Sequence, residues 1–193
     1  MNYQAASQFP RVDSALVERS RKVQAAVLCD VAGRRGTMNS RVRALNPQFT
    51  VCGPAFTVEV RPGDNLMFHV ALAVAQPGDV IVVDAASRDT ATLAAGTFPV
   101  FSSGTNPCGP TKGLAGRLSI PISAGGVAVS PGDLVVGDVD GVVVIPRNDV
   151  EAVLQAAEKK LAAERQRIEE IDAGLLISPW LDEALRQAGM PTL

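Results

Sequence analysis

The sequence is poor in several residue types on which particular protein classes depend. Only 4% of its 193 residues are aromatic, and it has one histidine and three cysteines. So few aromatic side chains make stacking platforms for nucleic-acid bases an unlikely design. Cys29, Cys52 and Cys108 are widely spaced and form no CxxC pair, which predicts neither a disulfide framework nor a zinc site. We therefore expect reduced thiols in a cytoplasmic protein.

Strong charge and long apolar runs are also missing. A formal net charge of -2 gives no electrostatic attraction to nucleic acid or to an anionic membrane. No apolar run approaches the roughly 20 residues of a membrane span. The first 14 residues lack the charged and apolar regions of a signal peptide. These absences predict no nucleic-acid partner and no membrane partner.

What is present indicates a globular α/β protein. Hydrophobic residues make up 47% of the chain, enough for one domain with a full core. We expect a single α/β domain over residues 1–147 and a C-terminal helical extension over 148–193. Within the extension, apolar residues recur at helical spacing over 149–173, and Gly174 is a natural stop. Such a stripe predicts docking on the chain's own domain or on a neighbouring subunit.

The domain itself shows a helix followed by many short strands. Residues 13–28 predict one helix that Asp13 caps. Strands are expected over 50–52 and 55–60, separated by a glycine-proline pair. Residues 80–83 are apolar without alternation, which is typical of a strand in the middle of a covered sheet.

One tripeptide, Pro-Gly-Asp, occurs three times. Proline fixes φ and glycine accepts a positive φ, which is the chemistry of a type II turn. We interpret these tripeptides as structural turns without a catalytic role. They are Pro62-Gly63-Asp64, Pro77-Gly78-Asp79 and Pro131-Gly132-Asp133.

The strongest candidate site is the stretch VIVVDAASRD, residues 80–89. Its strand ends close to an Arg-Asp pair, and strand ends in open α/β sheets are where ligands bind. Arg88 offers a fixed fork that fits a carboxylate. Asp89 offers a hard oxygen ligand for a cation such as Mg²⁺. An isolated pair of this kind would be interpreted as a surface ion pair.

Other polar residues are weaker candidates. His69, in an apolar stretch, is more plausible as a packed histidine than as a catalytic base. Lys112 fits an anion site and a loop scaffold about equally well. Cys108 has no nearby histidine to activate it. Asp138 and Asp140 are interpreted as turn residues and not as a calcium loop.

Several runs of the sequence closely resemble one family throughout most of residues 28–189. The family contains 4-hydroxy-4-methyl-2-oxoglutarate aldolase and the regulator of ribonuclease activity A, and is called RraA-like. The resemblance lies in CDVAGRRGTM (29–38), CGPAFTVEVRPGDN (52–65), ALAVAQPGDVIVVD (71–84), SSGTNPCGPTKG (102–113) and GGVAVSPGDLVVGDVDGVVVIP (125–146).

The resemblance implies a swivelling β/β/α-type sandwich, assembled as a homotrimer or a dimer of trimers. It implies a class II aldolase that uses Mg²⁺ or Mn²⁺, cleaves 4-hydroxy-2-oxo acids to pyruvate and also decarboxylates oxaloacetate. By this resemblance Arg88 binds the pyruvyl carboxylate and Asp89 holds the metal, so both are candidate catalytic residues. The substrate is then a small oxo acid.

One part of the family pattern is missing. The family has two strands of the VVxD kind separated by a helix, and a glycine-containing loop with an acid helps to hold pyruvate. Here Asp84 leads through three small residues to Arg88, as if one helix–strand unit of about 30 residues were absent. We expect impaired activity, and apolar surface that is uncovered or covered by another subunit.

A second function stays open on these grounds. The ribonuclease-regulating branch of the family is non-catalytic and acts by protein interaction. That branch typically lacks the acid of the Arg-Asp pair. The presence of Asp89 therefore favours an enzyme, while the missing loop favours the regulator.

Overall fold

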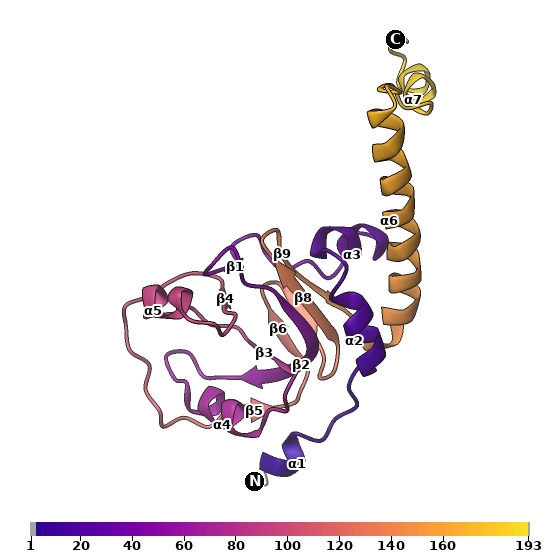
Figure 1. Ribbon diagram of the computed structural model, residues 1–193. Helices are drawn as coiled ribbons and strands as arrows, with labels where there is room; N and C mark the ends of the chain where they lie inside the picture. Colours follow the sequence, from indigo (N-terminus) through magenta and orange to yellow (C-terminus); the bar gives the residue numbers. More distant parts are fainter. Residues whose placement is uncertain (1–2, 193) are drawn as a thin grey trace. The chain divides into compact units, whose positions relative to one another are not determined.

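The computed structural model describes residues 3–192. Contacts divide the chain into two compact units, Met1–Ala157 and Glu158–Leu193. The first unit is a mixed α/β domain (Figure 1). Its elements are α1 (Tyr3–Ala6), α2 (Ser14–Ser20), α3 (Ala25–Val31), β1 (Arg43–Ala44), β2 (Val51–Glu59), α4 (Leu66–Val74), β3 (Val80–Val83), α5 (Thr90–Ala95), β4 (Phe101–Ser102), β5 (Arg117–Leu118), β6 (Ile122–Ala124), β7 (Val127–Val129), β8 (Leu134–Asp138), β9 (Gly141–Ile145), the 3-10 turn Arg147–Asp149 and the first residues of α6 (Val150–Asp172).

The main sheet is built around β2. Its strand order is β3-β2-β8-β9, and β5 pairs with the end of β2. The β2–β3 pair is parallel, and the other pairs are antiparallel. In Figure 1, α2 and α3 lie on one side of this sheet, while β1, β4 and α5 lie on the other.

The strand β2 is continuous, so the expected interruption at the glycine-proline pair was wrong. Val51 to Pro54 pair with β8, and Ala55 to Val58 pair with β3. The strand thus changes partner at the proline. Because proline cannot donate to a ladder, the point where pairing changes sides is where a strand best tolerates it.

The single helix expected over 13–28 is in fact two helices. Asp13 caps α2 as predicted, since its carboxylate accepts the Ala15 N–H at 2.7 Å. A break at residues 21–24 then separates α2 from α3. The capping carboxylate of α3 is distant in sequence, because Asp138 accepts the Ala25 N–H at 2.8 Å. Asp138 therefore holds a helix start against the β8–β9 turn.

The strand β3 lies at the end of the sheet and not in its middle. Only Val82 is buried, and the other three residues are half-buried. The sequence pattern is that of a strand with neighbours on both edges, but the structure supplies β2 alone. The expected burial was wrong because, within residues 3–192, no strand pairs with the outer edge of β3.

Two apolar clusters form the core on the two faces of β2. One face carries Ala55 and the other carries Phe56 and Val58, as the alternation of a strand requires. The first cluster consists mainly of valines: Met38, Ala55, Val82, Ala124, Val129, Val135, Val142 and Val144. The second consists of Phe56, Val58, Met67, Ala71 and Leu118, with α4 packed over it.

All three Pro-Gly-Asp tripeptides form the predicted turns. Gly63, Gly78 and Gly132 have φ of 77°, 94° and 84°. In each turn the aspartate N–H bonds the carbonyl three residues earlier, at 3.0 to 3.1 Å. Each aspartate side chain also accepts from one backbone N–H close to the turn and from a segment distant in sequence.

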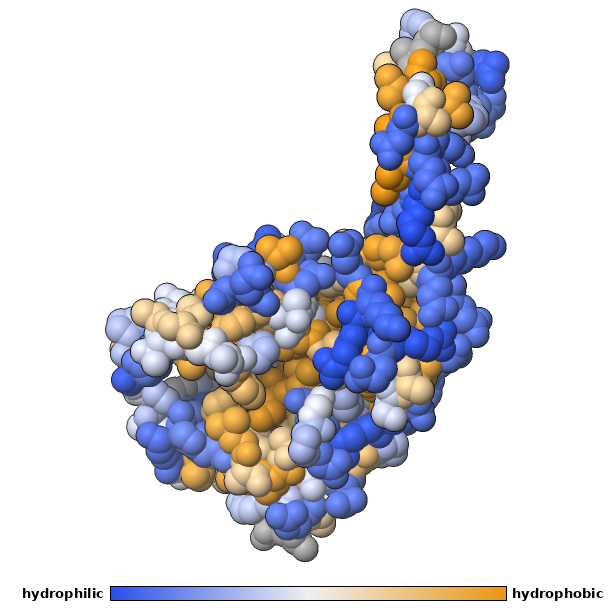
Figure 2. Space-filling model, viewed as in Figure 1, coloured by the Kyte–Doolittle hydropathy of each residue, from blue (hydrophilic) through white to orange (hydrophobic). Residues whose placement is uncertain are grey.

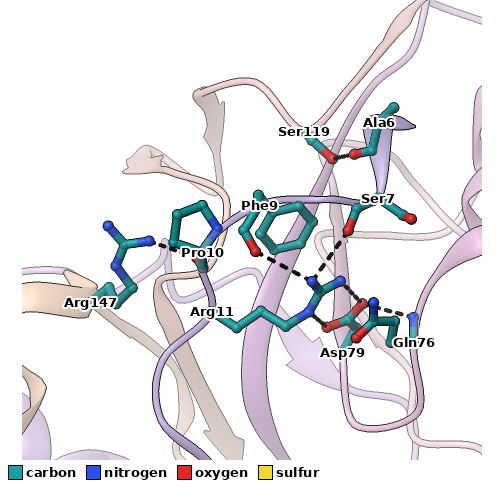
Figure 3. Close-up of polar contacts among 9 residues, drawn as sticks. All are labelled: Ala6, Ser7, Phe9, Pro10, Arg11, Gln76, Asp79, Ser119 and Arg147. Atoms are coloured by element: carbon teal, nitrogen blue, oxygen red, sulfur yellow. Dashed lines mark hydrogen bonds and ion pairs between the residues drawn. The ribbon is translucent and has the colours of Figure 1, made fainter. Parts of the chain in front are cut away.

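The N-terminal segment around Arg11 bonds two of these turns, those of Asp79 and Asp133; Figure 3 shows the contact with Asp79. Arg11 forms a two-point ion pair with Asp79, at 2.7 and 2.8 Å, and the Asp79 side chain is 1% exposed. The Arg11 guanidinium also lies 4.0 Å from the Phe9 ring centre. At the next turn, Gly132 accepts the Val12 N–H, and a Cβ on Gly132 would lie 1.9 Å from the Pro10 oxygen.

The second unit is helical. It contains the later part of α6, which extends to Asp172, and α7 (Leu181–Gln187). The long C-terminal helix was thus predicted correctly; its first turns bury Val150, Leu154 and Ala157 in the first unit. Docking of the extension on its domain or on a neighbouring subunit stays a prediction. Among the helices of residues 3–192, none combines the length and apolarity needed to cross a membrane.

Gly132→Ala should destabilise the protein far more than Gly78→Ala. Both positions have positive φ, which costs alanine about 1 kcal/mol or more. Only at Gly132 would the new methyl group also meet backbone, since nothing lies within 4 Å of the corresponding Cβ at Gly78. We expect a difference of at least about 2 kcal/mol in the free energy of unfolding by urea. Equal losses would contradict the close approach of the N-terminal segment.

Asp64→Asn should remove a pH-dependent part of the stability. Hydrogen bonds from Gly113, Leu66, Thr111 and Leu114 lower the pKa of Asp64 to about 2. The unfolded chain has a pKa near 4 there, so the stabilisation is present above about pH 4 and is lost as the pH falls through about 2. The variant should be less stable at pH 7 and depend less on pH between about 4 and 2. Asp149→Asn, at an exposed carboxylate, is the control for urea titrations.

Candidate functional site

The candidate site lies just beyond the carboxyl end of β3. Arg88 and Asp89 follow this strand and immediately precede α5. Asp89 adopts a left-handed conformation, with φ 54° and ψ 33°. Aspartate tolerates this conformation better than most residues. The backbone thus turns sharply at the pair and presents both side chains outward.

The two side chains bond each other but remain accessible. Arg88 Nε donates to Asp89 Oδ2 at 3.0 Å, and the side chains are 48% and 67% exposed. An exposed pair of this kind contributes little to stability, about 0–1 kcal/mol. Both groups are therefore free to exchange this contact for a ligand.

A glycine makes room for the guanidinium. A Cβ built on Gly109 would lie 2.6 Å from Arg88 Nη1. The guanidinium therefore rests against the backbone of the loop 103–113. Apart from its place in the NPCGP run, nothing in the sequence singled out Gly109.

The loop 103–113 is attached to the strand end on one side. Ser87 N–H donates to the Gly104 carbonyl at 3.0 Å, and Asn106 N–H donates to the Ser87 carbonyl at 2.9 Å. Ser103 Oγ donates to the Ala85 carbonyl at 3.3 Å. The residues between β3 and Arg88 thus pair with this loop as a short parallel bridge.

Asp64 attaches the other end of the loop. Its carboxylate, 5% exposed, accepts from Thr111 Oγ1 at 2.7 Å, Gly113 N–H at 2.7 Å and Leu114 N–H at 3.1 Å. These bonds lower its pKa to about 2, so it is an anion at neutral pH. The first Pro-Gly-Asp turn, Pro62-Gly63-Asp64, therefore supports the site, a role that its sequence did not indicate.

An apolar hollow of about 110 Å³ lies beside β3. Figure 2 shows apolar side chains gathered in a hollow on the face in view. Its walls come from Val80–Ala85 on one side and from Pro99 and Phe101–Ser103 on the other. The floor is valine-rich and belongs to the first core cluster, with Met38, Val135 and Val142 among its members.

The other candidates from the sequence do not join this site. His69 is exposed on α4 and lies near the Phe68 ring, so the expectation of a packed histidine was wrong. Lys112 and Cys108 are exposed on the loop, and within residues 3–192 neither side chain is hydrogen-bonded to Arg88 or Asp89. Asp138 caps α3 and also bonds the Asp140 N–H, which accounts for both as structural turn residues.

The acidic residues here suit a weakly held cation and not an enclosed one. Within residues 3–192, no group of three or more His, Cys, Asp and Glu side chains could hold a metal ion. Asp89 alone offers an accessible carboxylate at the pair. One carboxylate fits Mg²⁺, which keeps several waters and often takes further ligands from the substrate. The arrangement can thus bind a carboxylate at Arg88 and a hydrated cation beside it.

Proteins of known sequence and structure resemble this chain over most of its length. A Halalkalibacterium halodurans protein named "Putative 4-hydroxy-4-methyl-2-oxoglutarate aldolase" is 36% identical, covering 78% of this chain and 86% of that protein. The crystal structure of Streptomyces coelicolor RraAS2, described as an unusual member of the RNase ES inhibitor RraA family, matches with a TM-score of 0.69. The two sequences are 26% identical, and the match covers 82% of this chain and 100% of the Streptomyces chain. The RNA-processing inhibitor RraA of Thermus thermophilis, 20% identical with a TM-score of 0.57, covers 64% of this chain and 92% of its own and shares the fold.

The alignment with the Halalkalibacterium protein also contains a gap. It extends over 180 positions but includes only 78% of this 193-residue chain. About 30 aligned positions therefore have no residue here, which is the size of a strand–helix–strand unit. This agrees with the unit expected to be missing between Asp84 and Arg88.

The sequence model of the family matches the chain in two overlapping ranges. The model described as "RraA-like: Aldolase/RraA" matches residues 25–87 and again 81–144. The two matched ranges overlap at residues 81–87, the segment that contains most of β3. The two matches together span well over half of the chain. The chain belongs to the RraA-like family.

Proposed function

We propose that this chain is a divalent-metal-dependent carbon–carbon lyase acting on 4-hydroxy-2-oxo acids. The substrate we favour is 4-hydroxy-4-methyl-2-oxoglutarate, with pyruvate as a product and oxaloacetate decarboxylation as a related reaction. The observation that carries the proposal is the Arg88–Asp89 pair at the end of β3, open to a ligand and backed by Gly109. The related aldolase from Halalkalibacterium supports the same class of reaction.

Each residue of the pair has a distinct part in this proposal. Arg88 would bind the substrate carboxylate through two parallel N–H bonds. Asp89 would hold Mg²⁺ or Mn²⁺ together with water and substrate oxygens. A bound cation would stabilise the negative charge that develops on the substrate oxygen when the carbon–carbon bond breaks. Gly109 keeps the guanidinium in place by leaving room for it.

The missing unit lowers the activity that we expect. In the family, the absent loop contributes backbone N–H groups and an acid that hold pyruvate. In this chain β3 leads to Arg88 and Asp89 with no helix between them, and we propose that the pair acts without that loop. Removing donors that stabilise a transition state typically costs about 100- to 1000-fold in rate per group. We therefore propose slow catalysis.

We also propose that the chain assembles as a homotrimer or a dimer of trimers.

Arg88→Ala and Asp89→Ala should each abolish metal-dependent pyruvate release. The assay follows pyruvate from 4-hydroxy-4-methyl-2-oxoglutarate and from oxaloacetate, with and without Mg²⁺. Losing the charged hydrogen bonds of Arg88 should weaken substrate binding about 10- to 100-fold. Asp89→Ala should remove the response to Mg²⁺. A metal-independent background that is equal in wild type and both variants would refute the lyase.

Gly109→Ala should raise KM while Gly104→Ala should not. Neither glycine needs a positive φ. A methyl group at Gly109 would displace the Arg88 guanidinium, whereas nothing lies within 4 Å of the corresponding position at Gly104. Isothermal titration with pyruvate gives the same comparison without turnover. Equal effects of the two substitutions would mean that Arg88 is not the anchor.

The missing loop supports a second candidate, a non-catalytic regulator of ribonuclease activity. A relative from Streptomyces belongs to a family described by ribonuclease inhibition. If the chain inhibits a ribonuclease, and Asp89→Ala inhibits equally, the regulator is the better description. An inhibition that requires no residue of the Arg88–Asp89 pair would separate this function from the lyase site.

A further inference from the structure

A second hollow of the first unit lies apart from the Arg88–Asp89 pair. It is bordered by the segment after α3, by β7, by the end of β9 and by the start of α6. Its volume is about 310 Å³, at the lower end of the roughly 300–1,000 Å³ of pockets that bind small molecules. Among residues 3–192, it shares no lining residue with the hollow beside β3. We call it the β9 hollow.

Aliphatic side chains form most of the wall of the β9 hollow. Val127 and Ala128 contribute from β7, and Val153 contributes from the start of α6. Val144 and Ile145 of β9 are 3% and 0% exposed, so this part of the wall is fixed in the core. The lining contains no aromatic ring on which a planar ligand could stack. The wall therefore suits the aliphatic part of a small ligand.

Arg35 brings a positive charge to the β9 hollow. The next residue, Gly36, has a φ of 74°, and its carbonyl accepts the Val144 N–H at 2.9 Å. A Cβ on Gly36 would lie 2.0 Å from the Val144 oxygen, so the backbone here is pressed against β9. Within residues 3–192, the Arg35 side chain has no hydrogen bond and no ion pair. Its guanidinium is therefore available to a ligand.

Asp149 brings a negative charge to the same hollow. It ends the 3-10 turn Arg147–Asp149, and its N–H donates to the Pro146 carbonyl at 2.8 Å. The turn is held from two sides, because Arg147 donates its N–H to Asp133 at 3.0 Å and its Nη1 to the Pro10 carbonyl at 2.7 Å. In the part of the chain from residue 3 to 192, the Asp149 carboxylate has no partner.

The two charges border one hollow without pairing with each other. The guanidinium nitrogens of Arg35 and the carboxylate oxygens of Asp149 are more than 4 Å apart, because they form no ion pair. A ligand that carries both charges can satisfy both groups. A ligand carboxylate fits the arginine fork with two parallel hydrogen bonds, and a ligand ammonium donates to the aspartate. The other carboxylate at the hollow, Asp133, already accepts from two backbone N–H groups.

We propose that the β9 hollow binds a zwitterionic α-amino acid with an aliphatic side chain, of the kind of leucine. Arg35 binds its carboxylate, Asp149 binds its ammonium group, and the aliphatic wall takes its side chain. Neither charge alone would distinguish an amino acid from an oxo acid or an amine, but the two together do. This binding does not depend on the proposed lyase activity.

Titration calorimetry of the full chain with L-leucine tests the ligand class. The matched probes are 4-methylpentanoate, which lacks the ammonium group, and 3-methylbutylamine, which lacks the carboxylate. Each should bind at least ten times more weakly than leucine, because each loses the hydrogen bonds of one charged group. Glycine should also bind at least ten times more weakly, because it buries no side chain. Equal affinity of leucine and 4-methylpentanoate, or no saturable binding by about 10 mM leucine, would overturn the proposal.

Two matched pairs of variants locate the charges. Arg35→Gln should weaken leucine binding at least tenfold, whereas Arg34→Gln, at an exposed residue outside the hollow, should leave it unchanged. Asp149→Asn should weaken binding likewise, and Asp172→Asn, in the second unit, should not. The four residues are exposed, so the variants should fold, and circular dichroism checks this. Equal effects within either pair would refute the proposed contacts.

A further pair tests the aliphatic wall. Ala128→Leu should fill part of the hollow and weaken leucine binding at least tenfold, whereas Ala152→Leu, exposed on α6 outside the lining, should not. If Ala128→Leu does not fold, the charge variants decide the matter. Unchanged binding by folded Ala128→Leu would place leucine elsewhere and overturn the proposal.

Arg88→Ala separates the β9 hollow from the proposed lyase site. This variant should bind leucine as the wild type does, even if it no longer binds pyruvate. A loss of leucine binding in Arg88→Ala would place the amino acid at the Arg88–Asp89 pair and contradict the β9 hollow as its site. Absence of lyase activity, with leucine binding intact, would refute the proposed function alone.

Discussion

Three shielded carboxylates connect the parts of this domain. Asp64, Asp79 and Asp133 occupy the same place in three identical turns, and each bonds a segment beyond its own turn. Through them the loop 103–113, the N-terminal segment and the 3-10 turn before α6 are attached to the central sheet. A carboxylate is suited to this because it accepts several hydrogen bonds at once, and bonds to charged groups are the stronger ones.

The three Pro-Gly-Asp turns could be predicted from the sequence, but the distant segments that their aspartates bond could not. Pro-Gly determines the turn through φ, which is local information. The Asp64 bonds to Thr111 and Gly113 span 47 and 49 residues, and no local pattern encodes them. The same holds for Asp138, which was predicted as a turn residue and also caps a helix 113 residues earlier in the sequence. The sequence therefore predicted local backbone conformation better than it predicted hydrogen bonds between distant segments.

The two wrong predictions about strands have a common cause, because both depended on which strands pair with each other. The apolar run at Val80–Val83 predicted burial on all sides, because relatives of such strands lie between two neighbours. Among the described strands β3 has β2 as its one neighbour, so its residues have the pattern of a buried strand although three of the four are only half-buried. The interruption predicted at Pro54 failed for a related reason. Proline was tolerated because the strand changes partner there, and pairing is tertiary information.

The separation between Asp64 and Gly113 also bears on how the domain folds. The absent unit would lie between these residues, so the loop that their bond closes is 49 residues here instead of about 80. Loop-closure entropy grows only with the logarithm of length, about 0.6 kcal/mol for each doubling. A shorter loop thus assists closure by a few tenths of a kcal/mol. By topology this chain should fold slightly faster than a chain in which the same bond closes the longer loop.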